Sequence, residues 1–387
     1  MSRSLLDQLP SIVASGKRQA ATILESLEGR NRVTLQTREL VIPSKDTATA
    51  DLFRAARDEE APPTSLDGMN RLIYGDNLLA MAALLAGDEH LPSFRGKVDL
   101  IYIDPPFDSK ADYRTKISLP GTTLDQRPAV IEQFAYSDTW ADGTASYLAM
   151  IAPRLVLMRE LLADSGSIYV HLDWHVGHYV KMVMDDIFGK EHFLNEIVWH
   201  YGGRGAKAIS GQLPRNHDVL YWYRKSDKVF YKRSYVKAAI PIAGQSGFMQ
   251  DSDGRWFKTS PRGDYTDDSI ARLRLENRVY ETANGGIRIK YFLESDGKYI
   301  YEDKLIGDVW DDIPDAMHMA RSERLDYGTQ KPEKLLDRII SISCPDGGLV
   351  ADFFVGSGTT AAAAERLSRS WVVSDLGKQG VGQSTTA

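Results

Sequence analysis

The sequence has 387 residues, enough for a sizeable core and more than one domain. Its hydrophobic fraction of 43% and charged fraction of 26% are those of an ordinary globular protein. No stretch approaches the roughly 20 apolar residues of a membrane span, and the N-terminus lacks a signal-peptide pattern, so we expect a cytoplasmic protein. A single cysteine, Cys344, excludes an internal disulfide framework and a Cys-rich zinc site.

The first 68 residues are predicted to form a helical extension and a linker. The spacing of apolar residues favours a helix over 5–27 with a break near Pro10, then a strand over 33–42. Residues 43–68 are polar and contain two consecutive prolines, which is typical of a linker.

A strand–helix–strand unit begins at residue 71. Apolar runs predict strands over 71–74 and 98–103, and the helix between them, 77–86, has Asp76 or Asn77 as a suitable N-cap. A βαβ unit of this size implies parallel strands and a doubly wound α/β sheet.

The alternation of helices and strands continues downstream and is interrupted once. We expect helices over 147–163, 178–188, 332–342 and 359–367, and strands over 167–170, 196–199, 219–223, 349–354 and 371–373. The periodicity is lost in the polar, turn-rich stretch 226–321. The sequence therefore predicts one α/β domain that is split by an inserted module.

The segment Asp104-Pro105-Pro106-Phe107 directly follows the strand 98–103. Ligands of open α/β sheets bind beyond the carboxyl ends of the strands, so a site is expected here. The prolines remove two N–H donors and leave carbonyl oxygens and the Asp104 carboxylate as acceptors. With the Phe107 ring beside them, these acceptors suit a planar group that bears an amino donor. A proline strand stop with an incidental aspartate would produce the same pattern.

A glycine-rich turn, 352–360 (DFFVGSGTT), lies between a strand and a helix. Its glycines permit a tight turn and close approach of a ligand, and the helix N-terminus favours an anionic or electron-rich group. About twenty residues later, Asp375 ends the next strand, where dinucleotide-binding folds place an acid that binds ribose. The pattern indicates NAD or another nucleoside-type cofactor, or a purely structural turn.

A basic segment, 201–240, stands out in a chain whose net charge is −6. It holds nine cations and two acids, with aromatic residues interleaved, which indicates a surface that attracts phosphates or simply a solvated face. The predicted DNA contacts are Arg204, Lys207, Arg215, Lys228, Lys232 and Arg233.

Together these motifs resemble the β-group (permuted) amino-methyltransferases of DNA. In that family a D-P-P-[YF] motif precedes the target-recognition insertion and an F-x-G-x-G motif follows it, the order of Asp104–Phe107 and Phe354–Gly358 here. Further matches are Gly75-Asp76-Asn77-Leu78, Gly166-Ser-Ile-Tyr-Val-His171, Asn216-His217-Asp218 and Thr329-Gln330-Lys331-Pro332. The resemblance covers residues 68–377. In the layout of its motifs, the sequence is most similar to modification subunits of restriction–modification systems, including the type III kind.

The resemblance implies a Rossmann-like, S-adenosylmethionine-dependent methyltransferase that methylates the N6 amino group of adenine in double-stranded DNA. It implies an N-terminal extension (1–68), a catalytic domain in two parts (69–225 and 322–387) and a target-recognition insertion (226–321). The target base would be flipped out of the duplex, because its amino group is paired inside it. A restriction subunit and a second copy of the chain are the expected protein partners.

The same resemblance assigns roles to individual residues. Asp104 and the Pro105 carbonyl would accept hydrogen bonds from the target amino group, Pro106 would complete the motif, and Phe107 would stack on the base. The cofactor would be held by Asp76, Lys331, Asp352, Phe354, Gly356, Ser357, Gly358, Thr359 and Asp375, with Asp76 at its adenine edge and Asp375 at its ribose.

Two other features are interpreted as structural, and one departs from the family. No metal is expected at His171, Asp173, His175 and His178, because their spacing is not that of a helical zinc motif. Cys344 precedes a proline at a helix end and is predicted to be a packed thiol. The tail 379–387 (QGVGQSTTA) lacks the helix that family members place after the ribose-binding acid, so we expect a truncated end.

Three alternatives remain open at this point. Cytosine-N4 methyltransferases share the architecture, although DPPF resembles the adenine enzymes more than S-P-P variants do. A Rossmann oxidoreductase would leave Asp104–Phe107 unexplained and would carry its glycine loop near the start of the chain. A DNA-binding modification subunit without activity shares the basic segment, and catalysis alone separates it from the main interpretation.

Overall fold

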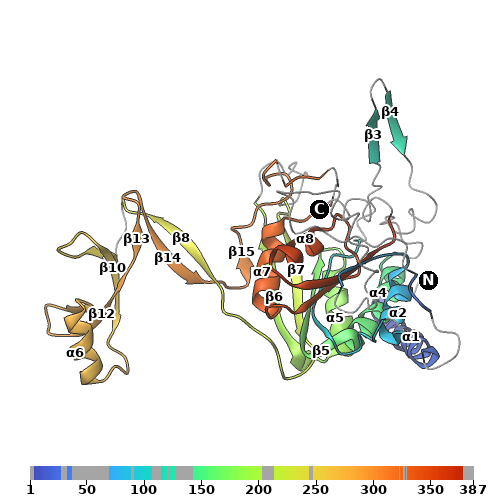
Figure 1. The fold of residues 1–387 in the computed structure, drawn as a ribbon, viewed down its shortest axis with the longest axis horizontal. Coiled ribbons are helices and arrows are strands. Elements are labelled where there is room, and N and C mark those ends of the chain that lie inside the picture. Colours follow the sequence, from blue (N-terminus) through green and yellow to red (C-terminus); the bar gives the residue numbers. More distant parts are fainter. Residues whose placement is uncertain are drawn as a thin grey trace, which may run out of the picture. The chain divides into compact units, whose positions relative to one another are not determined.

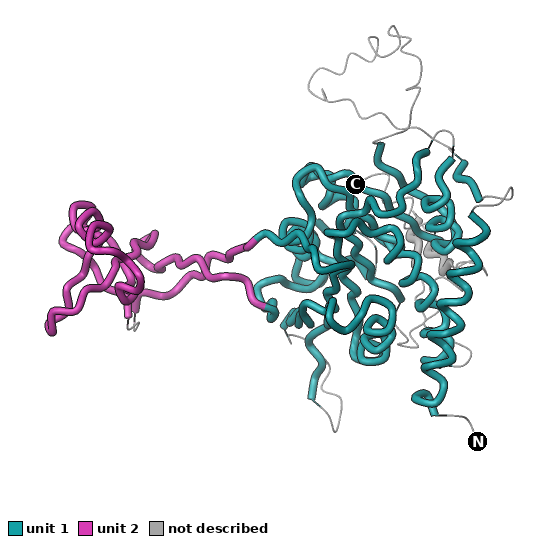
Figure 2. Tube along the Cα trace, turned by 90° about the horizontal axis from the view of Figure 1, so that it is seen from below, with its two compact units in different colours: residues 1–232, 308–387 teal, residues 233–307 magenta. Residues whose placement is uncertain are grey.

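The computed structural model describes residues 4–27, 33–36, 69–88, 91–106, 115–119, 122–126, 143–202, 213–243, 247–321, 323–325, 327 and 329–377. These residues form two compact units, one comprising 1–232 with 308–387 and the other 233–307 (Figure 2). In the described part of the chain, no helix is long and apolar enough to cross a membrane.

The larger unit is built on an eight-stranded sheet of order β1-β17-β16-β2-β5-β7-β6-β15. Its strands are β1 (Arg71–Tyr74), β2 (Val98–Ile103), β5 (Leu162–Leu172), β6 (Phe193–His200), β7 (His217–Arg224), β15 (Val309–Trp310), β16 (Leu349–Asp352) and β17 (Ser370–Asp375). β7 runs antiparallel to its neighbours β5 and β6, and the other neighbouring pairs are parallel. The predicted doubly wound α/β sheet is confirmed.

Helices cover both faces of this sheet (Figure 1). One group packs together as α1 (Leu5–Ser26), α2 (Asn77–Ala86), α4 (Thr144–Leu161) and α5 (Gly177–Phe188), and a separate pair is α7 (Glu333–Ser343) with α8 (Thr359–Arg366). From β2 the chain passes through α4 to β5, whereas from β16 it passes through α8 to β17 in the opposite direction along the sheet. The strand order therefore reverses between β16 and β2, where open sheets form a ligand-binding crevice.

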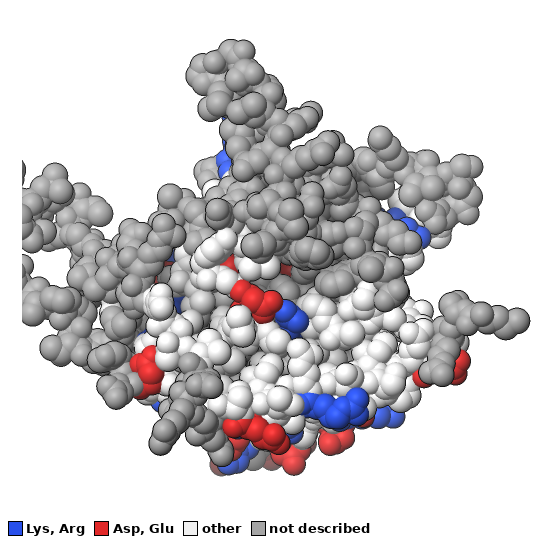
Figure 3. All heavy atoms as spheres, turned by 90° about the vertical axis from the view of Figure 1, so that its right-hand side faces the viewer, with Lys and Arg blue, Asp and Glu red and all other residues white. Residues whose placement is uncertain are grey.

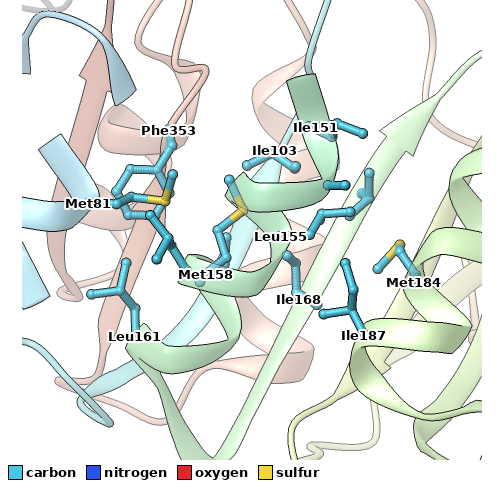
Figure 4. Close-up of a cluster of buried hydrophobic side chains, with 14 of the residues drawn as sticks. Met81, Ile103, Ile151, Leu155, Met158, Leu161, Ile168, Met184, Ile187 and Phe353 are labelled. Atoms are coloured by element: carbon cyan, nitrogen blue, oxygen red, sulfur yellow. The ribbon is translucent and has the colours of Figure 1, made fainter. Parts of the chain in front are cut away.

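The core of the larger unit lies between the sheet and the helices α1, α2, α4 and α5 (Figure 4). Met158 and Leu155 of α4 are fully buried in a cluster that also contains Ile103, Ile168 and Phe353. Burying side chains of this size contributes about 1.5–3 kcal/mol each. Ile103 directly precedes Asp104, and Phe353 directly precedes Phe354. The packing of this core therefore fixes where the Asp104–Phe107 and Phe354–Gly358 motifs begin.

The N-terminal extension differs from its prediction in two places. α1 continues through Pro10. Proline has no N–H group, so the carbonyl of Leu6 loses its helical hydrogen bond, and water can take the place of that donor because Leu6 is exposed. The helix is held by close packing on α4: a Cβ at Gly16 would stand 2.7 Å from the Cβ of Ala152. Residues 33–36 form no strand, and the rest of the predicted strand 33–42 lies outside the described residues.

The smaller unit, 233–307, consists of two antiparallel sheets and one helix. The first sheet joins β8 (Tyr235–Pro241), β13 (Glu294–Ser295) and β14 (Tyr299–Leu305), and the second joins β9 (Met249–Gln250), β10 (Trp256–Pro261), β11 (Val279–Glu281) and β12 (Ile287–Phe292), with α6 (Asp267–Leu275). This unit lies inside the predicted insertion 226–321. Residues 226–232 and 308–321 belong to the larger unit, where β15 adds a strand to its sheet.

Two further short elements lie among the described residues. Strands β3 (Thr115–Leu119) and β4 (Thr122–Gln126) pair as an antiparallel hairpin between β2 and α4. A single 3₁₀ turn (Lys190–His192) connects α5 to β6.

Candidate functional site

The two predicted motifs meet at the reversal between β16 and β2. β2 ends at Ile103, and the sequence Asp104-Pro105-Pro106 ends its pairing, because proline cannot donate to a strand ladder. β16 ends at Asp352, and the glycine loop 353–358 follows it. The two strands are direct neighbours in register, Ala351 with Ile101, so both motifs lie at the carboxyl edge of the sheet. Phe107 lies outside the described residues.

One carboxylate oxygen of Asp104 is hydrogen-bonded to Lys331, and the other has no hydrogen-bond donor among the described residues. Its Oδ2 accepts a hydrogen bond from Lys331 Nζ, and both side chains are largely buried, 16% and 13% exposed. Its Oδ1 is buried, and no described group hydrogen-bonds to it. A buried carboxylate oxygen without a donor costs free energy, about 1–3 kcal/mol or more for a charged group. The geometry is that of an acceptor aimed at a donor supplied by a ligand.

The glycine loop is anchored by Asp352. Its Oδ1 accepts from the Phe354 amide at 2.9 Å and its Oδ2 from the Thr360 hydroxyl at 2.6 Å. Burial, followed by the negative charges of Asp104 and Asp375, raises the pKa of Asp352 to about 7 despite these hydrogen bonds. Three carboxyl groups thus converge on one edge of the sheet.

The loop itself depends on glycine at two positions. Gly356 and Gly358 have φ values of +53° and +89°, a region that other residues rarely adopt. A Cβ at Gly356 would also approach the Tyr327 ring to 3.2 Å. Gly358 is the N-cap of α8, and the buried Thr359 hydroxyl, which lies 2.9 Å from the Ser357 hydroxyl, donates to the Lys331 carbonyl at 3.3 Å. The structure therefore brings the loop and Lys331 together.

Asp375 connects the loop to the neighbouring strand. Its Oδ2 accepts from the Gly356 amide at 2.8 Å and its Oδ1 from the Gly377 amide at 2.7 Å. The Asp375 carbonyl in turn accepts from the Gly75 amide at 3.0 Å, which places the end of β1 beside it. Asp375 and the loop form one hydrogen-bonded cradle.

Asp76 stands next to this cradle as the N-cap of α2, as predicted. Its Oδ1 accepts from the Leu78 amide at 2.7 Å, and Arg154 of α4 lies 3.4 Å away. Arg154 also donates to Asn77 Oδ1 at 2.6 Å, and Asn77 donates to the Phe353 carbonyl at 2.8 Å. These contacts connect Asp76 to the start of the glycine loop, and sequence reasoning did not anticipate the role of Arg154.

A second buried polar cluster lies beside Asp104. His171, at the end of β5, has Nδ1 at 2.9 Å from the Tyr102 hydroxyl and Nε2 at 3.3 Å from Asp218 Oδ2. Burial raises the pKa of Asp218, but the hydrogen bond with His171 and the charge of Lys331 outweigh it and hold that pKa below its usual value. The motifs 166–171 and 216–218 contained this signal, but sequence reasoning did not pair them.

The histidine-rich segment after β5 has partners other than a metal. Asp173 accepts from the backbone and the ring of His175. Within the described residues, no group of three or more His, Cys, Asp or Glu side chains could hold a metal ion. Cys344 is fully buried, as predicted, and burial raises the pKa of its thiol to about 12. A neutral thiol of this kind is a poor nucleophile.

Among the predicted DNA contacts that the structure describes in the larger unit, Arg215 lies apart from Lys228 and Lys232. Arg215 precedes β7 at the carboxyl edge of β5, the edge of Asp104. Lys228 and Lys232 lie at the opposite edge, where the Phe230 and Lys232 amides bond the carbonyls of Ser165 and Ile342. Arg233 belongs to the smaller unit, and Arg204 and Lys207 lie outside the described residues.

Several known proteins are similar in sequence to this chain. A family model described as DNA methylase matches residues 98–385. The type II methyltransferase M.EcaI of Enterobacter cloacae is 26% identical, over 86% of this chain and 71% of its own length. The probable type III restriction-modification enzyme HindVI Mod subunit of Haemophilus influenzae is 24% identical, over 84% and 51%. The StyLTI Mod subunit of Salmonella typhimurium is 27% identical, over 77% and 50%. The chain thus spans about half the length of these type III subunits.

Proposed function

Because this chain belongs to the N6/N4 DNA methylase family, whose methyl donor is S-adenosylmethionine, we propose that it methylates the N6 amino group of adenine in double-stranded DNA. The observation that carries the proposal is the buried Oδ1 of Asp104, which has no donor among the described residues and lies beside the glycine loop. The sequence Asp-Pro-Pro-Phe favours adenine over cytosine. The relatives named Mod subunits support a modification role with a restriction subunit as partner.

The cradle around the glycine loop fits the cofactor. Glycine at 356 leaves open a position that a Cβ would fill against Tyr327, and amide groups at the start of α8 suit a carboxylate. When bound, S-adenosylmethionine supplies an electrophilic methyl group. The residues proposed to hold it are Asp76, Lys331, Asp352, Phe354, Gly356, Ser357, Gly358, Thr359 and Asp375.

Asp104 is proposed to act on the target amino group. Its Oδ1 and the Pro105 carbonyl accept hydrogen bonds from the two N–H groups, which draws the nitrogen out of conjugation with the ring and orients its lone pair. Lys331 holds Oδ2, so the carboxylate cannot rotate away. The nitrogen loses one proton as its new bond to carbon forms, and Asp104 is proposed to receive that proton. Holding both reactants in line accounts for most of the rate, and no covalent enzyme intermediate is required.

Nucleoside mass spectrometry tests the proposal. The protein is incubated with unmethylated plasmid DNA and S-adenosylmethionine, and the DNA is digested to nucleosides. N6-methyladenine that is absent with the Asp104→Ala variant is the expected result. N4-methylcytosine would retain the mechanism but contradict adenine as the target. Folded protein that produces neither nucleoside would favour an inactive or partner-dependent DNA-binding subunit.

The Gly356→Ala variant is expected to bind S-adenosylmethionine at least tenfold more weakly. Alanine at a φ of +53° costs about 1–2 kcal/mol, and its Cβ would press on the Tyr327 ring. Isothermal titration calorimetry measures the affinity. Gly254→Ala is the matched control, because Gly254 has a φ of +77° in the smaller unit with nothing within 4 Å of its Cβ position. Equal affinity of both variants would show that the loop does not hold the cofactor.

A further inference from the structure

An exposed aromatic residue lies at the same edge of the sheet as Asp104. Trp174 follows β5, the strand next to β2, and the register of Ile103 with Val170 sets the ends of both strands side by side. Its side chain is 46% exposed, whereas Trp199, Trp222 and Trp310 are all less than 10% exposed. An indole left in water forgoes a large burial energy, and exposed aromatic residues near a site commonly contact a partner.

Trp174 is part of a stack that the protein holds in place. The Arg215 guanidinium lies 3.6 Å from the centroid of the indole, and the His175 ring lies 3.7 Å from it at a tilt of 33°. His175 is fixed by Asp173, which accepts from its backbone amide at 2.9 Å and from its Nδ1. Arg215 itself is exposed. An ordered indole beside an exposed guanidinium presents an apolar surface and a positive charge together.

The carboxyl groups at this edge of the sheet differ in their partners. Asp104 forms an ion pair with Lys331, Asp173 and Asp218 lie against the rings of His175 and His171, and Asp352 and Asp375 accept from backbone amides. On the described part of the face in Figure 3, most side chains are uncharged and cations stand next to acids. The stack at 174 and 215 combines an exposed aromatic ring with an exposed cation.

We propose that Trp174 and Arg215 bind the DNA strand next to the extruded target nucleotide, Trp174 by packing on the flanking nucleoside and Arg215 by contacting a phosphate. This inference rests on the proposed function, since it takes DNA as the substrate. Aromatic packing and a cation are the two components by which proteins hold unstacked nucleic acid, and bases beside an extruded nucleotide have lost a stacking partner. Phosphate contacts also fix the register of the protein on the duplex.

The two residues make different, measurable contributions. Affinity for a fluorescein-labelled 30-base-pair duplex of randomised sequence is measured by fluorescence anisotropy between about 50 and 200 mM salt. Trp174→Ala is expected to weaken binding at least fivefold with an unchanged salt dependence, and Trp174→Phe to restore most of the loss. Arg215→Ala is expected to weaken binding and to reduce the slope of log K against log salt by about one, because one phosphate contact is lost. Arg215→Lys keeps that slope but loses the planar stack.

Controls separate this inference from folding and from the proposed function. Met182→Ala removes a similarly exposed apolar side chain from α5 and is expected to bind DNA like the wild-type protein. Melting temperature and S-adenosylmethionine affinity should not change in Trp174→Ala. Variants at 174 and 215 that bind and methylate DNA like the wild-type protein would overturn the inference and leave the proposed function intact. A wild-type protein that neither binds the duplex nor methylates plasmid DNA would overturn both.

Discussion

The Asp104→Asn variant is expected to lose at least a factor of about 10³ in kcat for DNA methylation while it still binds S-adenosylmethionine. Asparagine has the same shape as aspartate but loses the charge that both Lys331 and the target amino group require. Removing one preorganised hydrogen-bonding group from an active site costs about 10²–10³ in rate, and here an additional ion pair is lost. Single-turnover methylation with radiolabelled cofactor measures the rate, and calorimetry measures the cofactor affinity.

A matched control for this variant exists on the same strand. Asp99 of β2 accepts a hydrogen bond from the Leu349 amide at 2.9 Å, near the opposite end of the strand. Asp99→Asn keeps an oxygen for that bond, so we expect kcat within about threefold of the wild-type value. Retention of more than a tenth of the activity by Asp104→Asn would contradict its role as the acceptor for the amino group.

The sheet and the crevice could be predicted from the sequence because both depend on local patterns. Short apolar runs that end in Asp104-Pro105 or Asp352 predict buried strands, and the helices between them follow from their periodicity. That parallel strands end at a common edge is a general property of the fold. A site at Asp104, which follows such a strand, could therefore be expected without any knowledge of side-chain contacts.

Long-range pairings could not be predicted in the same way. Lys331 and Asp104 are 227 positions apart, and His171 and Asp218 are 47 apart. No periodicity links such residues, because their contacts depend on the strand order and on rotamers in a packed core. Arg154 was missed for the same reason, since on the α4 sequence it resembles any solvent-facing arginine.

The cations of the basic segment are close in sequence but not in space. β7 has eight residues and, at about 3.4 Å each, spans roughly 27 Å. It carries the chain from Arg215 at one edge of the sheet to Lys228 at the other. Cations that are close in sequence thus lie on opposite sides of the larger unit. The aromatic partner of Arg215, Trp174, came from a different segment, and composition alone could not identify it.

The sequence of the smaller unit has little hydrophobic periodicity because this unit buries few apolar side chains. β8 alternates between exposed and half-buried residues along its whole length, and buried apolar side chains in this unit are few, among them Phe257, Ile270 and Ile289. Strands that bury little on one face can carry polar residues on both faces, so the hydrophobic pattern that marks a strand is weak.

Above pH 7 the Asp352→Asn variant is expected to be more stable than the wild-type protein by several kcal/mol. The pKa of Asp352 is about 7 in the folded protein, because of burial and the negative charges of Asp104 and Asp375, and near 3.9 when unfolded. Between these values the folded protein binds more protons than the unfolded chain. Stability therefore falls as pH rises, by up to about 1.4 kcal/mol per pH unit, and this loss is complete above pH 7.

Asparagine at 352 can keep both local hydrogen bonds without titrating. Its Oδ1 accepts from the Phe354 amide, and its NH₂ donates to the Thr360 hydroxyl, which can turn to accept. Urea unfolding followed by tryptophan fluorescence at pH 5, 6, 7 and 8 measures both proteins. The gap between them should widen by about 1.4 kcal/mol per pH unit up to pH 7 and then stay constant. Stability curves of the two proteins that run parallel from pH 5 to 8 would mean that Asp352 is already ionised in the folded protein. Burial and the charges of Asp104 and Asp375 would then not raise its pKa to about 7.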